Sequence, residues 1–187
     1  RILKERRARW EADQLAKMKA AGKVPRDGSW KGKYEEPASP ELSAESSPGQ
    51  SGWATATVEQ CTTLVTKGTT PTSVGFPFRT EGVAFVKVEN LRRGRIDRAS
   101  IDCFIDEEAH TALKRSALEA GDVLISIAGT IGRLAVVRSE DVPANTNQAV
   151  AIARGSDMGL DSAFLLMALE STVVQTQARA RMRGGAM

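Results

Sequence analysis

The sequence is poor in the residues from which enzymes most often build catalytic centres. Its 187 residues include one histidine, His110, which falls within a helical pattern. A single histidine leaves no His-based triad and no histidine metal cluster, and such a residue is usually solvated or packed. The sequence also has no GxxxxGK[ST] phosphate loop, no Asp or Glu followed two residues later by Lys as in metal-dependent nucleases, and no glycine-rich turn for a methyl-donor nucleotide. We therefore expect a binding protein without a catalytic site, a metal or a cofactor.

Long apolar runs and cysteine pairs are missing as well. No apolar run approaches the roughly 20 residues that a membrane span needs, and the first residues are charged, unlike a signal peptide. Cys61 and Cys103 are too few for a disulfide framework and lack a CxxC spacing. These absences predict a cytoplasmic protein. The length of 187 residues leaves room for one sizeable domain and an appendage. Because the chain begins at Arg1 and stops after RGGAM, we expect it to be a fragment.

Residues 1–22 are predicted to form a long helix of the coiled-coil type. Residues 1–21 contain no Gly or Pro and are mostly strong helix formers, and Gly22 is suited to end the helix. A lone helix of this length is marginal in water, so we expect it to need a partner helix. The exposed helix also allows self-association. The alternative is a helix lying on its own domain, but a projecting arm is favoured by the linker that follows.

That linker comprises residues 23–52, in which Pro, Ser, Gly and Glu dominate and aliphatic residues are almost absent. Such a composition cannot bury enough apolar surface to offset the entropy of ordering. Trp30 and Tyr34 are exceptions that would dock the linker on another surface. We place a domain boundary here and assign residues 53–187 to a globular domain.

The globular region mixes strand and helix patterns without a strict βαβ repeat, so the predicted fold class is α+β. A short turn of helix is expected to start at Thr57 and a helix at Asp106, and one long helix is expected to start near Asp161 and to include SAFLLMALESTVVQTQARARM. The organising stretch is residues 121–148, GDVLISIAGTIGRLAVVRSEDVPANTNQ. Its two β-branched runs, joined through small residues and two glycines, predict a strand, a tight turn and a strand.

Several segments carry groups suited to nucleic acid. Residues 87–98 hold five basic residues against two acidic ones, which attracts phosphates, and arginine can read guanine edges; the alternative is an ordinary solvated loop. Residues 67–70 suit phosphate contacts or a plain turn, and the central turn has Arg133 at its exit. For residues 145–148 we favour a structural role in turns and buried hydrogen bonds over contacts to adenine. The candidate DNA-binding residues are Lys67, Thr69, Thr70, Lys87, Asn90, Arg92, Arg93, Arg95, Ser126, Thr130, Arg133 and Asn147.

Four blocks, taken in order, resemble the DNA specificity subunit of type I restriction–modification systems. ILKERRARWEADQLAKM, ending in GKVP, resembles that family's spacer helix, and the Trp53 region with LVTKGTTP resembles the opening of a target recognition domain. FVKVENLRRGRI is similar to the next segment, and LEAGDVLISIAGTIGRLAVV with NTNQAVAI resembles the domain's most recognisable block. The order of the blocks makes the resemblance specific, since each block alone is weak.

The resemblance implies a non-catalytic subunit that binds DNA sequence-specifically. In that family, two recognition domains separated by paired long helices each read one half of a bipartite site, and methyltransferase and translocating endonuclease subunits bind the specificity subunit. Residues 1–22 would then be a spacer helix and residues 53–187 a recognition domain that stops before the segment expected to complete it. Expected partners are double-stranded DNA and those subunits, with no membrane.

Two alternatives to this function remain. The first is a protein-interaction module that assembles a complex without touching DNA. The second is a small enzyme whose site is completed by a partner, and the single histidine and the lack of converging carboxylates count against it.

Overall fold

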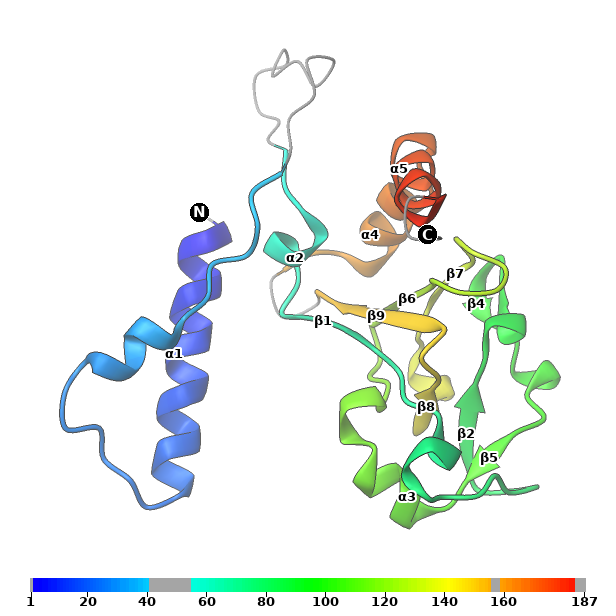
Figure 1. Ribbon diagram of the computed structural model, residues 1–187, viewed down its shortest axis with the longest axis horizontal. Helices are drawn as coiled ribbons and strands as arrows, with labels where there is room; N and C mark the ends of the chain where they lie inside the picture. Colours follow the sequence, from blue (N-terminus) through cyan, green and yellow to red (C-terminus); the bar gives the residue numbers. More distant parts are fainter. Residues whose placement is uncertain (1, 41–54, 156–158, 184–187) are drawn as a thin grey trace.

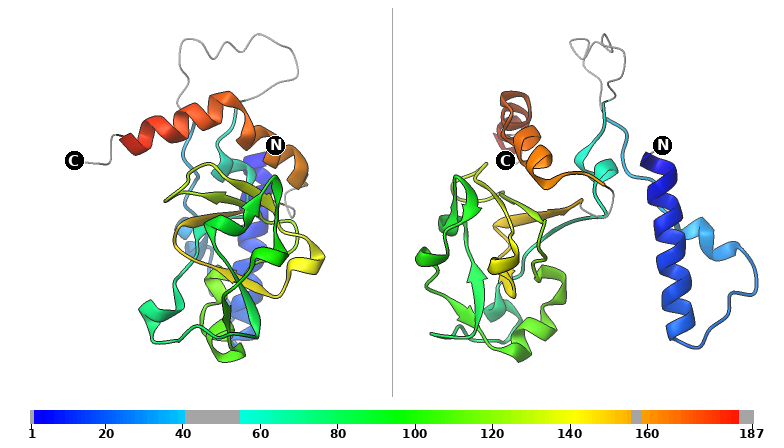
Figure 2. Two further views of the ribbon diagram at one scale, coloured as in Figure 1. Left: turned by 90° about the vertical axis from the view of Figure 1, so that its right-hand side faces the viewer. Right: turned by 180° about the vertical axis from the view of Figure 1, so that it is seen from behind.

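The computed structural model describes residues 2–40, 55–155 and 159–183, which form a helical arm and a domain of short helices and two sheets (Figure 1). The predicted α+β class is confirmed. Figure 1 and the right-hand view of Figure 2 show the arm standing to one side of the sheets. Among the described helices, none has the length and apolar character to cross a membrane. The domain boundary near residue 52 stays a prediction, because it lies outside the described residues.

Helix α1 (Ile2–Ala20) forms the arm, as the run of helix formers predicted. Gly22 follows it with a φ of +66°, and the Lys23 amide donates to the Met18 carbonyl at 2.8 Å, a hydrogen bond that closes the helix end. No residue of α1 is fully buried. Local propensity and capping therefore account for this helix better than a core does.

The first part of the predicted linker packs against α1. Its 3₁₀ helix η1 (Ser29–Lys33) buries Trp30, whose ring stacks on Trp10 with centroids 6.0 Å apart. Tyr34 meets the same Trp10 ring edge-on at 5.3 Å. The expected docking of Trp30 and Tyr34 is thus confirmed. Within the described residues, α1 is supported by this aromatic cluster and not by the partner helix that we expected.

The larger sheet has six strands, and the predicted central hairpin lies in its middle. Its order is β1 (Leu64–Lys67), β9 (Val150–Arg154), β6 (Val123–Ser126), β7 (Leu134–Val136), β4 (Gly94–Ile96) and β3 (Leu91–Arg92). Within this sheet β4 and β7 are parallel, and the other neighbours are antiparallel. The hairpin β6–β7 is confirmed, but its connection, residues 127–133, is longer than a tight turn.

A smaller sheet has the order β5 (Phe104–Ile105), β2 (Val83–Val86) and β8 (Ala144–Thr146), and helix α3 (Glu107–Ala112) packs beside it. Short 3₁₀ turns connect many elements: η2 (Pro71–Val74), η3 (Val88–Asn90), η4 (Arg98–Ser100), η5 (Lys114–Ser116) and η6 (Ser139–Asp141).

Three helices begin at the predicted caps. The side chains of Thr57, Asp106 and Asp161 accept hydrogen bonds from the third amide of α2 (Val58–Cys61), α3 and α4 (Ser162–Glu170). The final helical pattern divides at Ser171 into α4 and α5 (Thr172–Arg183), where we expected one helix. Ser171 has a non-helical ψ of 144°, and its hydroxyl accepts from the Val174 amide at 3.4 Å, so it starts the second helix.

Side-chain alternation in β6 and β7 divides the apolar core into two layers. Val123 and Leu134 face α4 and pack against Leu165, whereas Leu124 and Ala135 point to the opposite face and the main core. Figure 1 shows α4 and α5 above the part of the large sheet that contains β6 and β7. The two layers fix the central hairpin firmly, and with it the loop that joins its strands.

Candidate nucleic-acid interface

The basic segment of the sequence folds into a tight hairpin at the edge of the large sheet. Leu91 pairs with Ile96 and Arg92 with Arg95, so the loop consists of Arg93 and Gly94. These two have positive φ values of 50° and 74°, as a type I′ turn requires. Leu91 and Ile96 are buried, which turns the alternate positions, Arg92 and Arg95, toward solvent.

This hairpin forms one wall of a cleft of about 1050 Å³, named the arginine cleft below. Six arginines and three carboxylates line it: Arg92, Arg93, Arg95, Arg98, Arg133 and Arg138, with Asp97, Glu140 and Asp141. Arg133 comes from the central loop, which the parallel pairing of β4 with β7 brings beside the hairpin. A concave surface with an excess of one charge sign focuses the field and attracts a polyanion.

The carboxylates compensate some of these arginines and leave others available. Ion pairs join Arg92 to Asp97 at 3.4 Å, Arg98 to Asp141 at 3.9 Å and Arg138 to Glu140 at 3.5 Å. Among the described residues, no ion pair involves Arg93 or Arg95, and both side chains are exposed. The excess positive charge of the cleft is therefore concentrated at the hairpin tip.

Arg133 is half-buried, and its guanidinium reaches the Val88 carbonyl at 3.4 Å. Part of its hydrogen-bonding capacity is thus used within the domain. It lines the arginine cleft with one guanidinium donor already bonded to the Val88 carbonyl.

A continuous rim runs from the arginine cleft along one end of the large sheet. The register places the end of β1, the start of β9, the end of β6 and the starts of β7 and β4 at this same end. The sheet rim is defined by residues 67–70, 93–94 and 127–133. Four strand spacings of about 4.8 Å separate β1 from β4, so the rim is about 19 Å long, wider than a major groove of about 12 Å. Lys67, Thr69, Thr70 and Thr130 thereby share one end of the sheet with Arg93 and Arg133. Arg98 and Arg138 follow the opposite ends of β4 and β7.

Ser126, predicted to contact DNA, is fully buried instead. Its hydroxyl donates to the Thr130 carbonyl at 2.6 Å and accepts from the Arg133 amide at 2.8 Å. Buried polar groups are nearly always paired in this way, and the residue is inaccessible to a ligand. The prediction for Ser126 is corrected: it fastens the two sides of the central loop.

Asn90 also requires a correction, since its side chain is fully buried. Its Oδ1 accepts from the Lys87 amide at 2.7 Å, and its Nδ2 donates to the Ser100 carbonyl at 2.8 Å. Asn90 therefore joins the turn before the hairpin to the segment after it and is not available to DNA.

Lys87 and Asn147 are only partly available. The Lys87 ammonium lies 2.8 Å from Asp102 and 3.2 Å from Glu89, and its hydrogen bond to Asp102 raises the pKa of Lys87 above its ordinary value. It stays charged, but two carboxylates offset that charge. Asn147 is half-buried, and its Oδ1 accepts from the Ala149 amide at 3.1 Å. Of residues 145–148, Asn145 and Thr146 are fully buried, in agreement with the structural role that we favoured, whereas Gln148 is exposed.

The sequence candidates omitted two arginines of the cleft. Arg98 lies within the basic segment, but Arg138 follows β7 and has no basic neighbour to mark it. Only the β4–β7 pairing brings it to the hairpin. No local signal in the sequence indicated this residue.

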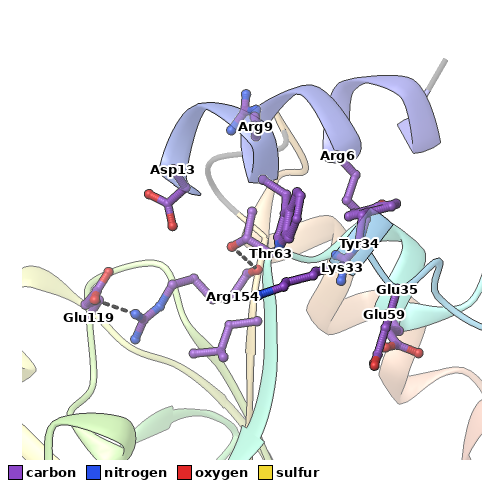
Figure 3. A pocket seen from close by; sticks show the side chains of 12 residues that line it. Arg6, Arg9, Asp13, Lys33, Tyr34, Glu35, Glu59, Thr63, Glu119 and Arg154 are labelled. Carbon is purple, nitrogen blue, oxygen red and sulfur yellow. Dashed lines mark hydrogen bonds and ion pairs between the residues drawn. The ribbon is translucent and has the colours of Figure 1, made fainter. Parts of the chain in front are cut away.

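A second cleft, of about 800 Å³, lies between α1 and the domain (Figure 3). Its charges are balanced: Arg6, Arg9, Lys33 and Arg154 face Asp13, Glu35, Glu59 and Glu119. Arg6 also donates to the Thr62 carbonyl, which connects the arm to the domain. A polyanion is not favoured by such a balanced lining.

The described residues contain no group of three or more His, Cys, Asp or Glu side chains placed to hold a metal ion. His110 contacts the buried Asn145 side chain, which itself donates to the Leu113 carbonyl at 3.1 Å. The lone histidine thus connects α3 to a packed polar network around Asn145.

Comparison with known proteins supports the family resemblance. No protein-family model matches the chain. The specificity subunit of the type I restriction enzyme EcoBI from Escherichia coli is 32% identical over 96 residues, which is 51% of this chain and 20% of that protein. The chain thus spans about a fifth of this relative's length. This similarity confirms the resemblance to type I specificity subunits that the ordered sequence blocks indicated.

A solved structure concerned with complex assembly and conformational transition of the type I R-M system aligns with 90% of this chain and 36% of that chain. The TM-score is 0.49 and the sequence identity is 19%.

Proposed function

We propose that this chain is the part of a type I specificity subunit that reads one half of a bipartite DNA site. The observation that carries the proposal is the arginine cleft, which opens onto the sheet rim and holds six arginines against three carboxylates. The similarity to the EcoBI specificity subunit supports the same conclusion independently of the geometry.

The geometry supports the following docking mode. Phosphates are drawn to the excess charge of the arginine cleft and release their counterions there. The rim, about 19 Å long, then lies across the major groove, with Lys67 and the Thr69 hydroxyl at one end and the arginine hairpin at the other. Thr130 and Arg133 lie between them on the central loop. The Thr70 hydroxyl donates to the Gln148 side chain, so its backbone is the part left to meet a phosphate. Backbone contacts fix the register, and the hairpin arginines approach base edges.

Helix α1 has the properties that a spacer needs. Its 19 residues span about 28 Å at roughly 1.5 Å per residue. Ile2, Leu3 and Leu15 are each exposed by 43–44%, so apolar surface remains for a protein partner. In the proposed function this arm sets the distance to a second recognition domain and docks the methyltransferase and endonuclease subunits. In this function the chain is a non-catalytic subunit that works in the cytoplasm.

The test is the salt dependence of DNA binding by the complete subunit assembled with its methyltransferase subunits. The double variant Arg93→Ala/Arg95→Ala should weaken binding and reduce the slope of log K against log salt by roughly 0.9 for each of the two arginines that neutralises a phosphate. Arg115→Ala is the matched control, because Arg115 is exposed and lines neither cleft. An unchanged affinity and slope in the double variant would reject the DNA-binding role and favour a protein-interaction module.

A further inference from the structure

Arg93 occupies a backbone conformation that suits other residues better. The first position of a type I′ turn prefers Asn, Asp or Gly, because its φ is positive, and Arg93 has a φ of +50°. Strained positions of this kind concentrate where a ligand is gripped. A hairpin optimised for stability alone would carry Asn-Gly here instead of Arg-Gly.

The charges on the hairpin are also unfavourable for the free protein. Arg92 and Arg95 stand directly opposite each other on neighbouring strands, an arrangement in which like charges repel. Asp97 relieves this repulsion on the Arg92 side at 3.4 Å, while Arg93 and Arg95 have no ion pair among the described residues. The positive φ of Arg93 and the opposed charges of Arg92 and Arg95 are both explained if the hairpin tip binds a group rich in hydrogen-bond acceptors.

Guanine is such a group. Its O6 and N7 face the major groove and match the two parallel donors of a guanidinium, a pairing that Lys cannot reproduce as a fork. A two-stranded β-ribbon fits this groove, so the tip of the β3–β4 hairpin is the part that enters first. Arg92 is less suited to base contact, because Asp97 holds its guanidinium away from the tip.

We propose that Arg93 reads one guanine of the half-site by a bidentate contact, while Arg92 and Arg95 act mainly through their charge on the flanking phosphates. The inference rests on the proposed function and deepens it, since it assigns one base of the target to one residue. It predicts that the half-site contains an invariant G·C pair whose recognition depends on Arg93.

The experiment is methylation-site mapping with the complete specificity subunit, assembled with its methyltransferase, on DNA carrying a randomised half-site. The lead variant is Arg93→Asn, because Asn-Gly is the preferred type I′ pair and preserves the hairpin. Arg93→Lys retains the charge without the fork. Arg92→Gln is the matched control, since it removes the same charge one residue away.

Arg93→Asn should lose preference for guanine at one position by roughly 5- to 150-fold, with the other positions intact. Arg93→Lys should lose part of this preference, because its ammonium still donates to O6 and N7 but lacks the planar fork. Arg92→Gln should lower methylation of all sites evenly and leave the motif unchanged. If the wild type yields a motif that Arg93→Asn and Arg93→Lys both preserve, guanine reading by Arg93 is overturned while the DNA-binding function stands. A wild-type complex that shows no sequence preference in this half-site rejects the proposed function, and the assignment of Arg93 with it.

Discussion

Removal of the buried Ser126 hydroxyl should loosen the central loop and weaken the domain. In Ser126→Ala the Thr130 carbonyl and the Arg133 amide lose their partner, at present 2.6 and 2.8 Å away. Each hydrogen bond contributes about 1 kcal/mol net, and a buried group left unpaired costs roughly 1–3 kcal/mol. Thr130 is exposed and can turn its carbonyl to water, whereas Arg133 is half-buried. We therefore expect a loss of about 2 kcal/mol in the free energy of unfolding.

Urea denaturation measures this loss, and amide hydrogen exchange locates it. The Arg133 amide should exchange faster in Ser126→Ala, because it no longer donates to the serine hydroxyl. Thr130→Ala is the matched control: it changes an exposed side chain of the same loop and should cost less than about 0.5 kcal/mol. An unchanged Arg133 exchange rate together with a stability loss below about 0.5 kcal/mol would refute the role given to Ser126.

Three further predictions concern the framework. Asp122→Ala should lower the free energy of unfolding, measured in urea, by roughly 3 kcal/mol. Asp122 is fully buried and its Oδ1 lies 2.7 Å from Nε of Arg154, which would lose that partner. A loss below about 1 kcal/mol would contradict the importance given to this ion pair. Trp30→Ala should release the first part of the linker from α1 and lower the helical circular dichroism signal, while the unfolding midpoint of the domain stays unchanged. Unaltered helicity would show that the aromatic cluster does not support α1. Asp106 has a pKa lowered from 3.8 by the Ala109 amide and by Arg79, so its stabilising effect is present above pH 3.8 and is lost as the pH falls through the folded pKa. The difference in free energy of unfolding between the wild type and Asp106→Ala should therefore shrink as the pH falls below 3.8. A difference that grows with falling pH would contradict the stabilising role of the Asp106 carboxylate.

Features governed by neighbouring residues were predictable from the sequence. The caps at Thr57, Asp106 and Asp161 lie next to the amides that they satisfy, and Gly22 ends α1 through its own backbone conformation. The central hairpin followed from two β-branched runs separated by glycines, because its strands pair within one short stretch.

Features governed by distant pairing were not predictable. The β3–β4 hairpin has Arg93 where a turn signal would have Asn or Asp, so composition indicated only a basic segment. Arg138 and Arg133 reach the hairpin through the β4–β7 pairing, which no local pattern reveals. Asn90 and Ser126 look like surface groups in the sequence, and their burial follows from hydrogen bonds that exist only in the folded chain.

In the proposed function the arginine cleft and the sheet rim form one DNA-binding face. Amide hydrogen exchange of the assembled subunit, with and without a duplex that contains its target site, can locate this face. We expect slower exchange on DNA binding in residues 67–70, 91–96 and 127–133, with no change in α3. Protection confined to α3 or to the cleft beside α1, with the rim exchanging as in the free protein, would contradict it.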